Sequence, residues 1–226
     1  MDVTDQVQAG GILVFFPSYG NLRNSFFTWK KGKTKSLFTQ MKKKAKIFEE
    51  SNKGSDDFNS LLQKFTETCK SGGKALLFAV MRGKVSEGID FPDNAARAVI
   101  TVGIPFPAMK DPVTEMKQEY NDHINSKETA VEKRLVSGKR WYQIQAFRAL
   151  NQALGRCIRH SRDWGAIILV DERWGGVNYF HPNKEPYLND VSKWLRTLAN
   201  PVPRYDQFIN DLRDFQKVNK ERTGQG

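Results

Sequence analysis

Short runs of apolar residues alternate with helical patterns along most of this chain, and this alternation restricts the fold more than any other feature. Four of the runs are apolar or nearly so, namely Gly11–Phe16, Ala75–Val80, Ala98–Gly103 and Ala166–Val170, and Ala45–Phe48, which contains Lys46, is a weaker candidate. A strand that is apolar on both faces is buried on both faces, which is typical of a parallel sheet covered by helices. The sequence therefore predicts an α/β fold with such a sheet.

Helices are expected between and after these strands. We predict them over 19–29, 55–69, 112–125, 139–159, 188–198 and 205–218. The predicted organisation is a polar N-terminal segment (1–10), an α/β domain (11–180) and a C-terminal helical extension (181–226). The segment from Lys30 to Lys46 holds eight lysines and no acid, so it is either a solvated flexible connector or a tract that follows a phosphate backbone.

Charge and cysteine content narrow the class of partner and the cellular compartment. Lysine and arginine number 36 among 226 residues against 25 acids, a net charge of +11, which favours a nucleic-acid partner; the alternative is solubility alone. Cys69 and Cys157 are too few for a disulfide framework or an iron–sulfur cluster, and the three histidines are too scattered for a metal site. No apolar run reaches the length of about 20 residues that spans a bilayer, so we expect a soluble intracellular protein without a membrane partner.

Polar residues follow two of the predicted strands, where ligands collect in parallel sheets. Ser18 begins a helix, where its hydroxyl either caps the helix or binds a phosphate together with free backbone amides. The loop Arg82–Phe91 combines two glycines, two cations and two carboxylates. That mixture suits a phosphate backbone on one side and a ribose hydroxyl or magnesium-bound water on the other, and the alternative is a purely structural turn.

The predicted helix over 139–159 carries a polar face that includes Gln152, Arg156 and Arg159. Two arginines three residues apart on that face are able to reach one anion, and guanidinium groups bind phosphate oxygens bidentately. The alternative is an ordinary solvated face. Gly155 in the middle of a helix costs about 1 kcal/mol relative to alanine, which suggests a close approach of another group there.

Three segments together resemble a known family. Phe15–Tyr19, Arg82–Phe91 and Gln152–Arg159 resemble motifs four, five and six of the iron–sulfur, XPD-like superfamily 2 DNA helicases, in the same order and spacing. The similarity extends from Gly11 to Trp174. Within this family, two further segments most resemble the Fanconi anaemia group J helicases, namely Gly103–Pro107 and the segment that begins at Trp141. The telomere-elongation regulator helicases are the next most similar branch.

The resemblance implies that the chain is the second RecA-like motor domain of a helicase. It implies arginine fingers at Arg156 and Arg159, with Gln152 at the phosphates or the attacking water. The remaining implied contacts are Gly88, Asp90, Glu87 and Gly155 near the nucleotide, and Ser18, Tyr19, Arg82 and Lys84 near the DNA.

Cofactors and partners also follow from the resemblance. ATP and Mg²⁺ would be held mainly by an N-terminal motor domain, which in this family also carries the iron–sulfur cluster. The other implied partner is single-stranded or forked DNA. The resemblance implies that the helicase moves along this DNA from 5′ to 3′ and acts in DNA repair in the nucleus.

This chain has no phosphate-binding G-x-x-x-x-G-K-[ST] loop. Gly32–Thr34 matches the end of that motif, but its first glycine would fall at position 27, which is phenylalanine. We therefore expect part of a larger protein that alone does not hydrolyse ATP. The competing hypothesis is a non-enzymatic nucleic-acid-binding module.

Overall fold

The structure is a computed structural model, and it describes residues 2–31, 35–51, 55–86, 89–91, 93–156, 158, 160, 162–175, 186–202 and 204–222. Five strands are present: β1 (Gly10–Phe16), β2 (Lys46–Glu49), β3 (Lys74–Val80), β4 (Ala98–Val102) and β5 (Ala166–Val170). The α-helices are α1 (Asp2–Gln6), α2 (Tyr19–Lys31), α3 (Lys35–Lys44), α4 (Ser55–Lys70), α5 (Pro112–Lys127), α6 (Gly138–Leu154), α7 (Lys193–Arg196) and α8 (Tyr205–Arg222). Short 3₁₀-helices are η1 (Asp93–Ala96), η2 (Val131–Lys133), η3 (Glu172–Gly175) and η4 (Tyr187–Asp190). The chain forms two compact units, 1–103 with 152–170 and 200–226, and 104–151 with 171–199.

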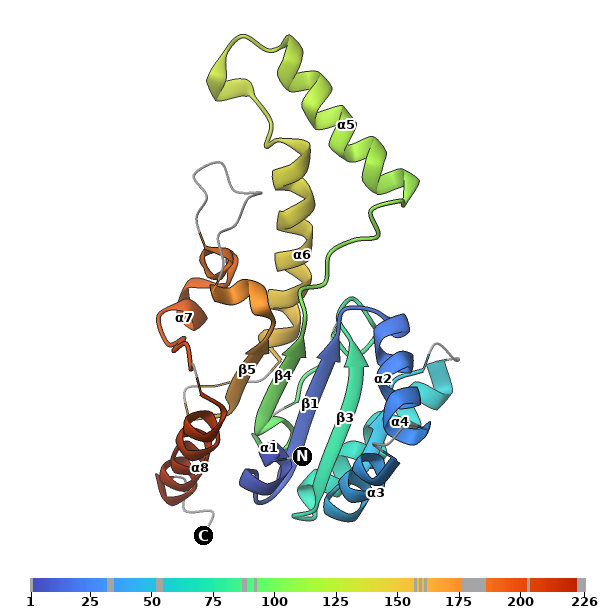
Figure 1. Ribbon diagram of the computed structural model, residues 1–226, viewed down its shortest axis with the longest axis vertical. Helices are drawn as coiled ribbons and strands as arrows, with labels where there is room; N and C mark the ends of the chain where they lie inside the picture. Colours follow the sequence, from blue (N-terminus) through green and yellow to red (C-terminus); the bar gives the residue numbers. More distant parts are fainter. Residues whose placement is uncertain are drawn as a thin grey trace. The chain divides into compact units, whose positions relative to one another are not determined.

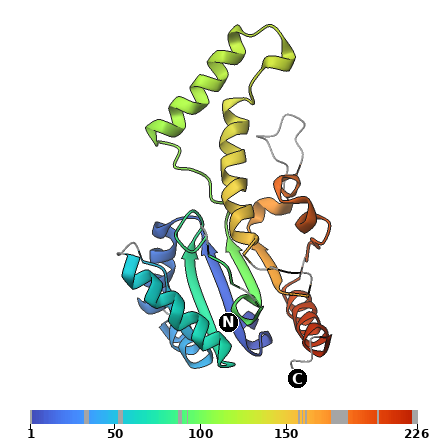
Figure 2. The same ribbon diagram turned by 180° about the vertical axis from the view of Figure 1, so that it is seen from behind.

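The first unit contains the whole sheet, whose strand order is β2-β3-β1-β4-β5. Figure 1 labels β3, β1, β4 and β5 side by side, and Figure 2 shows the sheet from behind. Every pairing is parallel, and β1 lies in the centre, with Gly10 opposite Lys74 of β3 and Ile12 opposite Ala98 of β4. The predicted α/β class is confirmed, and the sheet has the RecA-like architecture implied by the motifs. Each predicted apolar run forms a strand within two residues of its expected bounds.

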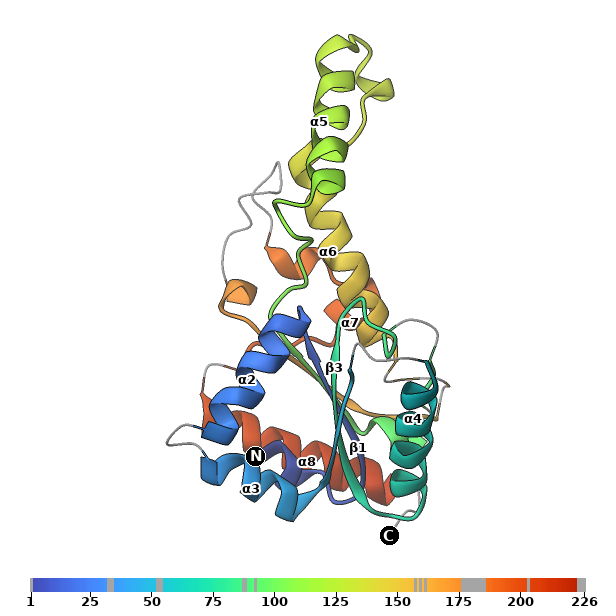
Figure 3. The ribbon, with the colours of Figure 1, turned by 90° about the vertical axis from the view of Figure 1, so that its right-hand side faces the viewer.

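Helices cover both faces of the sheet. The chain runs outward from β1 to β2 and then returns to β3, so two right-handed crossovers in opposite directions must use opposite faces. Figure 3 shows α2 and α3 on one side of the strands and α4 on the other. Since parallel strands end at one edge, the loops after β1, β2 and β3 meet at that edge.

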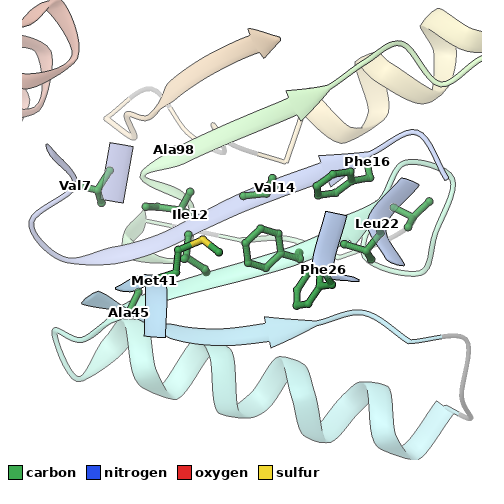
Figure 4. Close-up of a cluster of buried hydrophobic side chains, with 12 residues drawn as sticks. Val7, Ile12, Val14, Phe16, Leu22, Phe26, Met41, Ala45 and Ala98 are labelled. Atoms are coloured by element: carbon green, nitrogen blue, oxygen red, sulfur yellow. The ribbon is translucent and has the colours of Figure 1, made fainter. Parts of the chain in front are cut away.

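Alternation along β1 divides its side chains between two apolar layers. Ile12, Val14 and Phe16 join Phe26 of α2 and Met41 of α3 in one buried cluster (Figure 4). On the opposite face, Phe65 of α4 is fully buried and makes edge-to-face contacts with Phe48 and Phe91, at centroid distances of 5.6 and 5.7 Å. These layers fix the sheet against its helices and so fix the loops at its carboxyl edge.

The lysine-rich segment forms a helix, and the prediction of a flexible connector is wrong for the part the structure describes. Helix α3 buries Met41, and Phe38 packs edge to face on Phe26 at 5.6 Å. Leu37, Phe38, Met41 and Ala45 recur at helical spacing, so burial of one face outweighs repulsion between the lysines. A phosphate-backbone role for these lysines stays a prediction.

Helix α6 is shorter than predicted. It ends at Leu154, and Gly155 and Arg156 lie in a turn in which the Arg156 N–H donates to the carbonyl of Ala153 at 3.2 Å. The interpretation of Gly155 as a mid-helix glycine is therefore wrong, and Arg156 does not continue the polar helical face. Arg159 lies outside the described residues.

Both ends of the chain contribute helices to the sheet-containing unit. The Tyr205 hydroxyl of α8 donates to Asp2 of α1 at 2.5 Å, and Arg213 donates to Gln6 at 3.1 Å. The predicted helix over 205–218 is confirmed as α8, and the predicted polar segment 1–10 includes α1. The segment boundaries at residues 10 and 180 stay a prediction.

The second unit is organised around α6. Asp190 pairs with Arg140 at 2.6 Å and accepts a hydrogen bond from the buried amide of Gln143 at 2.6 Å. The prediction of one helix over 188–198 is wrong: this part of the chain forms η4, which ends at Asp190, and α7. Among the described residues, no helix combines the length and apolarity required to cross a membrane.

Candidate functional site

The candidate site lies at the carboxyl edge of the sheet in the first unit. Ser18 and Tyr19 follow β1, Glu50 follows β2, and the loop 81–86 follows β3. Strands β2, β3 and β1 are adjacent and parallel, so these three segments come together. Two of the segments belong to the motifs singled out from the sequence, and Glu50 belongs to neither.

Ser18 caps α2. Its Oγ accepts a hydrogen bond from the N–H of Asn21 at 3.1 Å and donates to the Asn21 side-chain oxygen at 2.5 Å. The capping alternative is therefore shown. The side chain remains exposed, so a contact between Ser18 and phosphate is compatible with the cap and stays a prediction.

Tyr19 is turned toward a buried carboxylate. Its hydroxyl donates to Oε1 of Glu50 at 3.2 Å. Burial of the phenol and the negative charge of Glu50 raise the pKa of Tyr19 to about 12. The phenol is therefore protonated at neutral pH and serves as a hydrogen-bond donor to Glu50. A DNA contact by Tyr19 would use its ring, which is half-buried, and stays a prediction.

The loop after β3 alternates between buried and exposed residues. Met81, Gly83 and Val85 are buried, whereas Arg82 and Lys84 are exposed between them. Arg82 adopts a left-handed conformation with φ of 68°, which is uncommon outside glycine. The Lys84 ammonium lies 5.7 Å from the ring centroid of Phe58. The loop thus presents two cations at the carboxyl edge of the sheet, and a contact between them and a phosphate backbone stays a prediction.

Arg156 meets the end of the loop that follows β3. Its Nη1 lies 3.1 Å from Oδ1 of Asp90 and donates to the carbonyl of Ile89 at 3.1 Å. The Arg156 side chain is 19% exposed and that of Asp90 is 63% exposed. The Nε of Arg156 is buried and has no hydrogen-bond partner among the described residues. Two motifs that are far apart in the sequence therefore share one ion pair, which is open to solvent on the Asp90 side.

The remaining predicted residues divide into two groups. Gln152 is exposed in the last turn of α6, and Gly155 lies in the turn before Arg156. Glu87, Gly88 and Arg159 lie outside the described residues, so the structure neither places them at the site nor removes them from it.

A second polar cluster lies beside β4 and β5. Arg97 and Asp163 form an ion pair at 3.0 Å in which the side chains are only 3% and 0% exposed. Asp163, Asp93 and His160 also offer ligand atoms within 4.8 Å of one another. Oδ1 of Asp163 already accepts hydrogen bonds from Arg97 and from the N–H of Trp164, so this arrangement is explained as a structural ion pair.

Sequence reasoning missed Glu50 and Arg97 as organising residues. Glu50 directly follows a short strand that begins with a lysine, and a charged residue at such a position is ordinarily solvated. Arg97 precedes a strongly apolar strand and looks like a polar boundary residue. Neither shows a sequence signal of burial, because the carboxylate of Glu50 bonds to Tyr19, Val80 and Val85, and Arg97 pairs with Asp163, all of which are distant in the chain.

Comparison with known proteins identifies the family. The helicase C-terminal domain family matches residues 2–197. The chain belongs to this family. A Fanconi anemia group J protein homolog from Gallus gallus is 43% identical over 215 residues, which cover 93% of this chain and 16% of that protein. A regulator of telomere elongation helicase 1 homolog from Drosophila persimilis is 38% identical over 218 residues, which cover 95% of this chain and 20% of that protein.

The names of these two relatives are those of the two helicase branches that the sequence indicated, and the resemblance to XPD-like helicases is confirmed. A solved structure named "XPD_APO" superposes with a TM-score of 0.48 at 24% identity, covering 76% of this chain and 30% of that one. The chain spans a fifth or less of the length of these two relatives.

Proposed function

We propose that this helicase C-terminal domain serves as one half of an ATP-dependent DNA motor, contributing arginine side chains to an ATP molecule held by a second RecA-like domain. The observation that carries the proposal is the ion pair between Arg156 and Asp90, because Asp90 belongs to the same segment after β3 as Arg82 and Lys84. One loop thereby connects a candidate phosphate-binding arginine with candidate DNA-binding cations.

The nucleotide side of the proposal rests on the chemistry of Arg156. Its side chain is partly exposed, and a guanidinium carries five N–H donors, so it can bind an incoming phosphate while paired with Asp90. A permanently charged, planar guanidinium stabilises the charge that develops when a γ-phosphoryl group leaves. Arg159 and Gln152 would complete the arginine-finger motif, with Gly88, Asp90, Glu87 and Gly155 around the nucleotide. Mg²⁺ and most contacts to ATP would belong to the other domain.

The DNA side rests on charge and exposure. Arg82, Lys84 and Ser18 are exposed at the carboxyl edge of the sheet, and the chain carries a net charge of +11. Such groups suit the backbone of single-stranded DNA, where contacts to phosphate fix position without reading sequence. A module that binds nucleic acid without ATP chemistry would use the same cations and would not need Arg156.

Further parts of the proposal follow from family resemblance alone. They are an N-terminal motor domain with an iron–sulfur cluster, movement from 5′ to 3′, forked DNA as a substrate, and a nuclear role in DNA repair.

Replacing Lys84 with alanine tests the DNA side directly. We expect weaker binding of single-stranded DNA irrespective of sequence, because a backbone contact is lost. The slope of log affinity against log salt should flatten by about 0.7, the value for one phosphate contact to a single strand. Fluorescence anisotropy with a labelled oligonucleotide between about 50 and 200 mM salt measures both quantities.

Lys70→Ala is the matched control, because Lys70 is exposed and ends α4, just before the opposite edge of β3. It removes the same charge without touching the candidate site. Equal losses in the two variants would reduce the effect to net charge and would reject Lys84 as a DNA contact.

A further inference from the structure

A buried carboxylate connects the two segments that we place at the DNA. Glu50 is 1% exposed, although it directly follows a strand whose first residue, Lys46, is exposed. Burying a charged carboxylate is costly unless hydrogen bonds replace its water. The donors that surround Glu50 therefore explain both its burial and its effect on the neighbouring segments.

Both carboxylate oxygens of Glu50 accept hydrogen bonds. Oε2 accepts from the N–H of Val80 at 2.8 Å, and Oε1 accepts from the N–H of Val85 at 3.3 Å and from the Tyr19 hydroxyl at 3.2 Å. Val80 and Val85 stand at the two ends of the loop that carries Arg82 and Lys84. Glu50 thus holds this loop at both ends and the start of α2 at a third point.

The loop closes around the carboxylate without spare room. A Cβ added to Gly83 would lie 2.6 Å from Oε1 and 2.8 Å from Oε2 of Glu50, closer than atoms in contact approach. Glycine at position 83 therefore lets the backbone reach the carboxylate. With Gly83 turned inward, its neighbours Arg82 and Lys84 are the exposed residues.

We infer that Glu50 is a positioning residue for DNA binding, which orients the cations of the loop 82–84 relative to Tyr19 and the start of α2. This inference rests on the proposed function, since it assigns a purpose to the geometry of the DNA-binding edge. Glu50 itself is buried and acts through the loop.

Glu50→Gln tests the inference with little change in shape. Glutamine replaces one accepting oxygen with an NH₂ group, which must then face a backbone N–H or the Tyr19 hydroxyl. The loop is expected to shift, and single-stranded DNA affinity of the chain should fall about tenfold, equivalent to roughly 1.4 kcal/mol. Affinity is measured by anisotropy well below the melting temperature of each variant, so that only folded protein is compared.

Glu49→Gln is the matched control, because it removes the same negative charge from the preceding residue. Loss of a negative charge alone favours binding to DNA, so Glu49→Gln should bind as well as the unmodified chain or slightly better. Weaker binding in Glu50→Gln is therefore opposite in sign to the electrostatic effect. Affinity that matches Glu49→Gln would overturn the positioning role.

A double-mutant cycle with Lys84→Ala separates positioning from general destabilisation. If Glu50 places Lys84, the lysine substitution should cost little further affinity in the Glu50→Gln background. Additive losses would contradict the inference. If Glu50→Gln does not fold, Tyr19→Phe takes its place in the same cycle, because it removes one of the three donors to Glu50. Loss of this single hydrogen bond should lower DNA affinity about threefold.

The outcomes also separate this inference from the proposed function. If Lys84→Ala alone leaves affinity and salt slope unchanged, the DNA-binding assignment of the loop fails and the inference falls with it. If Lys84→Ala weakens binding but Glu50→Gln behaves as Glu49→Gln does, the DNA assignment stands and only the positioning role is rejected.

Discussion

Replacing Arg156 with alanine is expected to lower ATP turnover by about 10³- to 10⁵-fold in a protein that joins this chain to its ATP-holding domain. The loss should concern turnover because the guanidinium stabilises charge that develops mainly in the transition state. Affinity for single-stranded DNA should survive, since Arg156 pairs with Asp90 and is not one of the DNA-side cations. Arg156→Lys should restore little of the turnover, because an ammonium group cannot bind phosphate bidentately as a guanidinium does.

Steady-state ATPase at saturating single-stranded DNA measures this effect, and a thermal melt of each variant accompanies it. Arg148→Ala is the control, because it removes the same type of side chain from an exposed position on α6. Near-normal turnover in Arg156→Ala would reject the arginine-finger role. Lost turnover together with a markedly lower melting temperature would favour a structural role, in which Arg156 mainly holds the carbonyl of Ile89.

Arg97→Ala is expected to reduce the free energy of unfolding by about 3–5 kcal/mol, the usual cost of removing one partner of a buried ion pair. Arg97 donates to Asp163 at 3.0 Å and to the carbonyl of Trp164 at 2.6 Å, and its guanidinium lies 4.4 Å from the Trp164 ring centroid. Alanine would leave the Asp163 charge buried without its cation. Urea unfolding followed by circular dichroism measures the loss.

Arg162→Ala serves as the surface control, because this neighbouring arginine is exposed. Replacing both partners, as in Arg97→Met with Asp163→Leu, should restore much of the lost stability, since no unpaired charge then remains. A loss below about 1 kcal/mol in Arg97→Ala, the range of surface ion pairs, would show that this pair does not hold β4 and β5 together.

The sheet was predictable from the sequence because most of its strands consist almost entirely of apolar residues. Gly11–Phe16 and Ala75–Val80 leave no polar face to expose, so burial between helices is the one arrangement that shields them. The same reasoning failed for the lysine-rich segment before β2. Its eight lysines favoured a solvated segment although Leu37, Phe38, Met41 and Ala45 recur at helical spacing, and the structure shows Phe38 packed on Phe26.

The candidate site was predictable in part. The exposure of Lys84 and the capping role of Ser18 follow from local sequence, because each depends on a short turn or a helix start. The pairing of Arg156 with Asp90 and the burial of Glu50 depend on contacts between distant segments, which one sequence does not display. The end of α6 at Leu154 was missed for the same reason, since helical periodicity continues past it.

In the proposed function, this domain completes an ATPase whose nucleotide is held by a second domain. The most direct test is ATP hydrolysis at saturating single-stranded DNA by the ATP-holding motor domain, measured with and without this chain. We predict little turnover by either component alone, turnover in the mixture, and none of that gain when the added chain carries Arg156→Ala. Turnover by this chain alone, or a mixture no faster than the ATP-holding domain by itself, would contradict the claim.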